Sequence, residues 1–123
     1  MASKNYKEWE IWKKAMELVE DIYGITKKFP REEEFGLVSQ MRRAAISIPS
    51  NLAEGHARIN KKDRHHFFVI SFASSKELET QLEISRRLHY VSEEVFNKSE
   101  IVLQEVIRRL SNFVFENNRK PAP

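Results

Sequence analysis

The chain has 123 residues, which fits one domain with a hydrophobic core, and it carries a net charge of +3. It contains no cysteine, which excludes disulfide bonds and thiolate metal sites, and no apolar run approaches the roughly 18 residues of a transmembrane helix. Without such a run we expect a cytoplasmic protein, outside any membrane. Three glycines and four prolines leave little room for turns, which favours a few long helices.

The first expected helix runs from about Lys7 to Phe29 and ends at Pro30. Its apolar residues cover an arc of about 180° on a helical wheel, whereas a helix that faces only its own core needs roughly 100°. The surplus predicts a second buried contact, for which an interface between copies of the chain is the simplest explanation. Deeper burial within one bundle is the alternative. The residues assigned to the interface on this helix are Trp12, Met16 and Tyr23.

The second expected helix begins within residues 35–37, ends near Arg58 and contains Pro49. Proline inside a helix removes one N–H and crowds the carbonyl four residues earlier, which bends or breaks the helix. The apolar spacing continues in phase on both sides of Pro49, so we expect one kinked helix. Ile46 lies on its outer side and joins the predicted interface. The carbonyls of Ala45 and Ile46 that the proline frees are expected to bond to the nearby side chains of Ser47, Ser50 and Asn51.

The third expected helix begins after Asn60, whose side chain can cap it, and extends from Lys61 to about His89. On its outer side, Phe68 and Phe72 are assigned to the interface between copies, where aromatic residues are enriched. The alternative is that they stack on the bases of a single-stranded nucleic acid. The inward face is rich in small residues, which implies a close approach of a neighbouring helix; it carries Phe67, Ile70, Ser71, Ser74, Ser75, Leu78, Leu82 and Ser85.

The fourth expected helix is capped by Ser92 and carries its core residues from Val95 to Val114. Residues 1–117 then form a single domain, and residues 118–123 form a loose C-terminal tail. Because the links between helices are short, consecutive helices must run antiparallel. The predicted fold is therefore all-α, an antiparallel up-down-up-down four-helix bundle whose second helix is kinked at Pro49.

The sequence offers little for catalysis or for binding a metal. A di-iron bundle needs two Glu-x-x-His pairs, and only Asp63 and His66 approach that spacing. The chain has no Gly-x-Ser-x-Gly elbow and no glycine-rich phosphate loop. We therefore expect no catalytic residue, no metal and no cofactor, and a protein that is not an enzyme.

Basic side chains are the candidates for nucleic-acid binding. Those from Arg58 to Arg64 surround the tight link between the second and third helices, so they gather at one end of the bundle. Clustered cations neutralise phosphates and release counterions, which makes affinity depend on salt. A solvated rim balanced by the 18 acidic residues is the alternative. The candidates are Arg42, Arg43, Arg58, Lys61, Lys62 and Arg64.

The segment R-R-A-A-I-S-I-P-S-N-L-A-E-G, from Arg42 to Gly55, resembles the signature of the 23S rRNA intervening-sequence proteins, also called the four-helix bundle protein family. The W-x-x-A-M-E-L segment (Trp12 to Leu18) and the E-L-E-T-Q-L segment (Glu77 to Leu82) match the same family in order and spacing. The resemblance implies a ring of five chains but says little about biochemistry. The fold is also similar to the accessory protein of diversity-generating retroelements, a basic pentameric barrel that binds nucleic acid and a reverse transcriptase.

Charge and resemblance together predict a homo-oligomer, a pentamer, that binds nucleic acid, most readily RNA, through basic patches. At +3 per chain, five copies carry about +15 around one axis. Phosphate contacts would then dominate the binding, and sequence preference would be weak. The alternative is a protein-interaction scaffold, a ring that docks a partner protein and has no nucleic-acid role.

Overall fold

The computed structural model describes residues 5–119, with side chains described as far as Phe115. Four α-helices account for most of this chain: α1 (Glu10–Thr26), α2 (Ser39–Ala57), α3 (Lys61–Arg87) and α4 (Glu93–Arg119). A short 3-10 turn, Tyr6–Glu8, precedes α1. A second 3-10 turn, Arg31–Glu33, and a π-helical segment, Glu34–Val38, connect α1 to α2.

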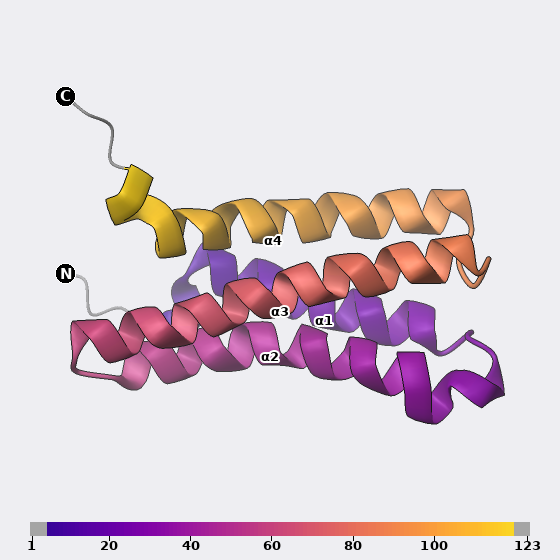
Figure 1. Cartoon of the computed structure of the whole chain (residues 1–123), viewed down its shortest axis with the longest axis horizontal. Coiled ribbons are helices and arrows are strands. Elements are labelled where there is room, and N and C mark those ends of the chain that lie inside the picture. The colour runs from indigo at the N-terminus through magenta and orange to yellow at the C-terminus, as the bar shows by residue number, and fades with distance from the viewer. Residues whose placement is uncertain (1–4, 120–123) are drawn as a thin grey trace.

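The four helices pack as an antiparallel bundle (Figure 1). The start of α1, the α2–α3 link and the end of α4 lie at one end, on the left of the view, and the other two connections lie at the opposite end. Each helix contacts the next, and α4 returns to contact α1, so the α1/α2 side of the bundle lies opposite its α3/α4 side. The predicted all-α, up-down-up-down bundle is confirmed.

The core consists of aliphatic residues that all four helices contribute, and the tightest packing is between α2 and α3. Small residues on α3 allow this approach, as predicted: the Ser71 hydroxyl donates a hydrogen bond of 2.7 Å to the carbonyl of Ile48 on α2. That bond satisfies a polar group that would otherwise be buried without a partner. The largest fully buried side chains are Leu18, Ile22, Met41, Ile48, Leu52, Leu78, Leu82, Leu103, Val106 and Leu110.

Helix α2 continues through Pro49 as one helix, as the unbroken apolar spacing predicted. The Asn51 side-chain amide donates to the carbonyl of Ser47 at 2.8 Å and to the Ser47 hydroxyl at 2.9 Å. Asn51 therefore bonds to backbone near the proline, but its acceptor is the carbonyl four residues before Asn51 rather than one of the two expected carbonyls. A departure from helical backbone angles lies earlier, at Gly36, where φ is −114° and ψ is −107°.

Several helix ends differ from the prediction; α1, for example, ends at Thr26 and not at Phe29. The first helix is interrupted at Trp9, whose ψ of 133° is extended, so the 3-10 turn and α1 are separate elements. Helix α4 reaches Arg119, so its backbone extends two residues into the range expected to be a tail. The rest of that range, residues 120–123, lies outside the described residues. Within the described residues, no helix is long and apolar enough to cross a membrane.

Candidate nucleic-acid interface

The α2–α3 link holds a compact group of cations at one end of the bundle. The Asn60 side-chain oxygen accepts hydrogen bonds from the backbone N–H groups of Lys62 and Asp63, at 2.8 and 3.2 Å. This is the predicted N-cap, and it fixes the start of α3 at Lys61. Because the first turn of α3 is fixed, the basic side chains of Lys61, Lys62 and Arg64 project from a defined backbone.

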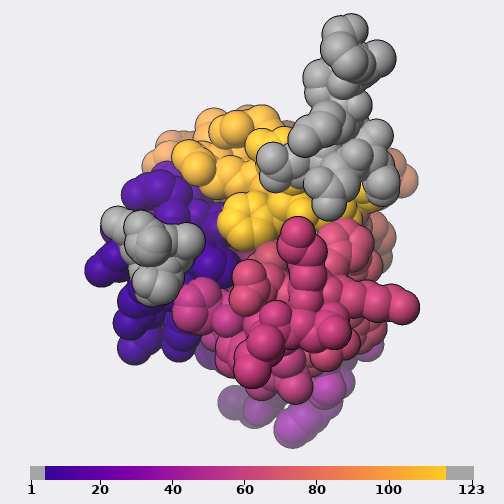
Figure 2. Space-filling view, turned by 90° about the vertical axis from the view of Figure 1, so that its left-hand side faces the viewer, coloured from indigo at the N-terminus to yellow at the C-terminus, as the bar shows by residue number. Residues whose placement is uncertain are grey.

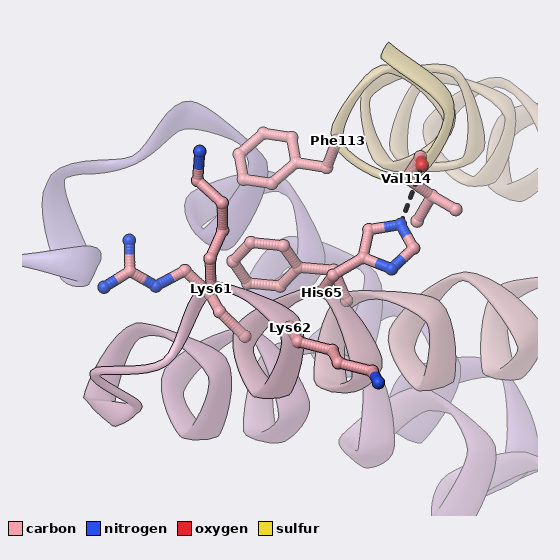
Figure 3. A pocket seen from close by; sticks show the side chains of 7 residues that line it. Lys61, Lys62, His65, Phe113 and Val114 are labelled. Carbon is pink, nitrogen blue, oxygen red and sulfur yellow. Dashed lines mark hydrogen bonds between the residues drawn. The ribbon is translucent and has the colours of Figure 1, made fainter. Parts of the chain in front are cut away.

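A cleft of about 540 Å³ opens beside this turn, between α3 and the last turns of α4. Figure 2 views this end of the bundle, where the α2–α3 region lies directly below the end of α4. The Phe68 and Phe113 rings, 5.2 Å apart between centroids, form the apolar part of its wall. The imidazole Nε2 of His65 lies 2.9 Å from the carbonyl oxygen of Val114 and joins the two helices (Figure 3). The cleft is lined by Lys61, Lys62, Arg64, His65, Phe68, Phe113 and Val114.

The cations at this end differ in whether they already interact with other groups of the chain. Arg58 forms an ion pair of 2.9 Å with Glu54 and lies over the Phe67 ring, 4.7 Å from its centroid. Arg64 donates a hydrogen bond of 3.0 Å to the Arg58 carbonyl. Neither Lys61 nor Lys62 forms an ion pair with any residue whose side chain is described. The two ammonium groups are exposed and therefore available to an anion.

Arg42 and Arg43 lie elsewhere, so the six predicted residues do not form one patch. Sixteen residues separate Arg42 from Arg58 on α2, which is about 24 Å along a helix. The Arg42 Nε donates a hydrogen bond of 2.9 Å to the Thr26 hydroxyl, and the guanidinium lies 4.3 Å from the centroid of the Tyr23 ring. Arg42 thus joins α2 to the end of α1. Arg43, in contrast, is exposed.

The α1/α2 side of the bundle brings together four of the predicted interface residues. Trp12, Met16 and Ile46 line an apolar groove of about 330 Å³ between α1 and α2. Ile46 also lines a neighbouring hollow of about 680 Å³ together with Tyr23 and Phe35. Ile46 is 41% exposed and Phe35 is 91% exposed, although both are large and apolar. We call these residues, with Val19, the α1/α2 apolar face.

The assignment of Phe68 to the interface is wrong. Phe68 is only 8% exposed and packs against Trp9 and Phe113 of its own chain, so it is a core residue. Phe72 is partly buried and packs edge-to-face on Phe115, with centroids 5.3 Å apart. Phe72 therefore lies on the α3/α4 side of the bundle, opposite the other predicted interface residues.

Phe113 and His65 line the cleft, although neither is among the residues predicted to bind nucleic acid. Phe113 had been placed in the core of the fourth helix, where its spacing fits, but at the end of the bundle its ring is partly exposed. No local pattern marks such a residue, because the cleft exists only where α4 passes the α2–α3 link. Three or more histidine and carboxylate side chains that could hold a metal ion do not come together anywhere in the described part of the chain.

Comparison with known proteins places the chain in a family. The family model described as "23S rRNA-intervening sequence protein" matches residues 7–112. The fold is similar to a crystal structure from Bacteroides thetaiotaomicron, a protein of unknown function from the S23 ribosomal protein family, with a TM-score of 0.78 and 22% identity. That match covers 85% of this chain and 97% of the other. No curated protein matches at a significant level. The chain therefore belongs to the 23S rRNA-intervening sequence protein family.

Proposed function

We propose that this protein is a non-enzymatic, homo-oligomeric RNA-binding module, a ring of five chains, whose basic ends contact the RNA backbone. The observation that carries the proposal is the cleft at the α2–α3 link, whose described lining residues include three basic residues and no acidic one. A site of this composition attracts phosphate and repels other cations. The family's description, which names an intervening sequence of ribosomal RNA, supports RNA as the nucleic acid.

Assembly would strengthen RNA binding, because several copies together carry more positive charge than one chain. A single chain has a net charge of only +3 and neutralises few phosphates. In a ring, every copy presents its own Lys61 and Lys62, and several phosphates of one RNA are engaged at once. Tethering sites in this way raises the overall affinity well above that of one site. The α1/α2 apolar face provides a surface through which copies can associate.

Filter binding to a structured RNA at several salt concentrations tests the proposal. We expect binding at low salt and a linear fall of log K with log salt, because the cations release counterions when they bind phosphate. A Lys61→Gln/Lys62→Gln protein should bind more weakly and with a shallower slope. The matched control is Lys27→Gln/Lys28→Gln, which removes the same charge from the other end of the bundle. An absence of binding at low salt, or equal losses in both variants, would contradict the proposal.

A second test compares Arg42 with the two lysines. Arg42 was predicted to bind nucleic acid, but its guanidinium already contacts the Thr26 hydroxyl and the Tyr23 ring. We expect Arg42→Gln to lower the stability by about 1 kcal/mol, the usual value of a lost hydrogen bond. Its affinity for RNA should fall less than that of the Lys61→Gln/Lys62→Gln protein. Thermal unfolding and filter binding on the same sample measure both effects.

One observation favours the alternative, a scaffold that docks a partner protein. Phe35 is 91% exposed at the end of the bundle remote from Lys61 and Lys62, and it lines one hollow with Ile46, so it belongs to an exposed apolar patch of the kind that marks contact surfaces. A partner protein retained by the chain from nuclease-treated lysate, and lost in a Phe35→Ser variant, would support this alternative.

A further inference from the structure

We propose that the cleft beside the α2–α3 link binds one unpaired nucleotide of a single-stranded RNA, with its base on Phe113 and its phosphate at Lys61. The proposal rests on the proposed RNA-binding function and goes beyond it. General phosphate binding needs only exposed cations on a surface. This cleft adds an aromatic wall, and that feature distinguishes an unpaired base, whose face is free to stack, from a base inside a duplex.

The size and composition of the cleft suit a nucleotide. Its volume of about 540 Å³ lies within the range of roughly 300–1,000 Å³ usual for pockets that bind small molecules. Apolar area dominates its surface, and the polar groups that it offers are the cationic side chains and His65. An aromatic ring beside a cationic side chain, here Phe113 beside Lys61, is the arrangement by which proteins bind single strands, since the base stacks and the phosphate is neutralised.

The aromatic wall is held rigidly. The Phe113 ring packs against Phe68 at 5.2 Å and against Trp9 at 5.7 Å between centroids. His65 on α3, at 2.9 Å from the Val114 carbonyl, fixes the last turns of α4 against α3. A base that enters the cleft therefore meets a ring that is already in place and does not need to be ordered on binding.

The electrostatics of the cleft also favour a phosphate. Figure 3 shows the Lys61 side chain on the same side of α3 as the Phe113 ring, so base and phosphate of one nucleotide can be engaged together. The nearest described carboxylates do not oppose this. Asp63 belongs to the same turn of α3 but does not line the cleft, and Glu54 is paired with Arg58.

Fluorescence anisotropy with two labelled RNAs tests the proposal: single-stranded decauridine and a blunt duplex of ten base pairs. We expect Phe113→Leu to weaken binding of decauridine about 5- to 150-fold, the range of one lost stacked base, and to leave duplex binding unchanged. Phe113→Tyr keeps an aromatic ring and should retain decauridine binding. Lys61→Gln should weaken binding of both RNAs, whereas the exposed Lys27→Gln should be close to the unmodified chain.

The outcomes separate this inference from the proposed function. If the unmodified chain binds neither RNA at low salt, the proposed function fails, and this inference fails with it. If it binds both RNAs but Phe113→Leu binds decauridine as well as the unmodified chain does, only this inference is overturned. Should Phe113→Leu fail to fold, photo-crosslinking of the unmodified chain to 4-thiouridine-containing decauridine decides the question. Crosslinks within residues 61–65 or 113–114 support the inference, and crosslinks confined to other residues overturn it.

Discussion

Gly55 sets how closely α2 and α3 approach at the basic end of the bundle. A Cβ atom built at Gly55 would lie 2.7 Å from Cε1 of Phe68 and 3.2 Å from the backbone oxygen of Arg64. Both distances are shorter than ordinary van der Waals contacts. The backbone oxygen belongs to α3 and cannot move without shifting the helix, and the Phe68 ring is held by its aromatic neighbours. Glycine is therefore required at this position by packing.

We expect Gly55→Ala to lower the free energy of unfolding by about 1–3 kcal/mol, as overpacking of a core usually does. Gly24→Ala is the matched control, because a Cβ at Gly24 in α1 meets nothing within 4 Å. It should stabilise the protein by about 0.5–1 kcal/mol, since alanine is the better helix former. Urea denaturation of the two variants measures both changes. A Gly55→Ala protein as stable as the unmodified chain would show that α2 and α3 are not held at this distance.

Glu83 makes the stability of the far end of the bundle depend on pH. Hydrogen bonds donated by Arg86 and Arg87, at 2.9 and 2.8 Å, lower the pKa of Glu83 from 4.5 to about 2. A carboxylate whose pKa is lowered by folding stabilises the native state above its unfolded pKa and loses that contribution as the pH falls towards its folded pKa. The contribution is thus present above pH 4.5 and lost between about pH 4.5 and 2.

Thermal unfolding of Glu83→Gln against the unmodified chain checks this dependence. We expect the variant to melt at a lower temperature at neutral pH, and the difference to shrink as the pH falls from 4.5 towards 2. Added salt should also reduce the difference, because the arginines are partly exposed and surface ion pairs are screened. Glu20→Gln, which removes an exposed carboxylate, is the control and should show no comparable trend. A difference as large at pH 2 as at neutral pH would contradict the assignment.

Among the elements, α1 and α2 leave large apolar side chains partly exposed along one side of the bundle. Trp12 and Met16 line the groove between the two helices, and Ile46 stands at its edge with 41% of its surface exposed. A carboxylate placed there would be buried without a partner when a second copy covers the groove, which costs several kcal/mol. The folded single chain would tolerate the same change, because position 46 remains in contact with water.

We therefore expect Ile46→Glu to reduce the assembly to single chains of 14.6 kDa while the helical circular dichroism is retained. Size-exclusion chromatography with light scattering measures the mass. Ile59→Glu is the control, since Ile59 is 96% exposed in the α2–α3 link and lies outside the groove. An Ile46→Glu protein that keeps the mass of the unmodified assembly would place the interface elsewhere.

The sequence predicts the elements well where local chemistry decides their ends. Asn60 and Ser92 were expected to cap α3 and α4, and their side chains accept hydrogen bonds from the first turns of those helices. The interruption at Trp9 was missed because the apolar spacing of α1 continues across it. What stops the helix there is packing of the Trp9 ring on Phe68 and Phe113, a contact between distant parts of the chain.

The burial of Phe68 is predictable from the spacing of residues within α3. Buried residues of α3 recur at alternating steps of three and four residues, and Phe68 is the first residue of this series. The cleft, in contrast to the position of Phe68, is not predictable from the spacing within one helix. It combines the first turn of α3 with residues of α4 that lie about 50 positions later, so periodicity within one element does not reveal it. The other members of that inward series are Ser71, Ser75, Leu78, Leu82 and Ser85.

Considered as a whole, the bundle has its basic cleft and its apolar face at different places. The cations and the cleft lie at the end that carries the α2–α3 link, and the α1/α2 apolar face runs along one side. Copies that associate through this side leave the ends of their bundles open. A ring would therefore display one basic end per chain, and five chains at +3 each carry a charge of about +15.

The mass of the protein in solution is the most direct test of assembly. Both the pooled positive charge and the proposed role of the α1/α2 apolar face depend on assembly. Light scattering behind a sizing column should give about five times the chain mass of 14.6 kDa, at protein concentrations well above and well below the micromolar range. A dimer or tetramer would retain association through the apolar face and exclude the ring of five. A mass of 14.6 kDa at every concentration would contradict the account.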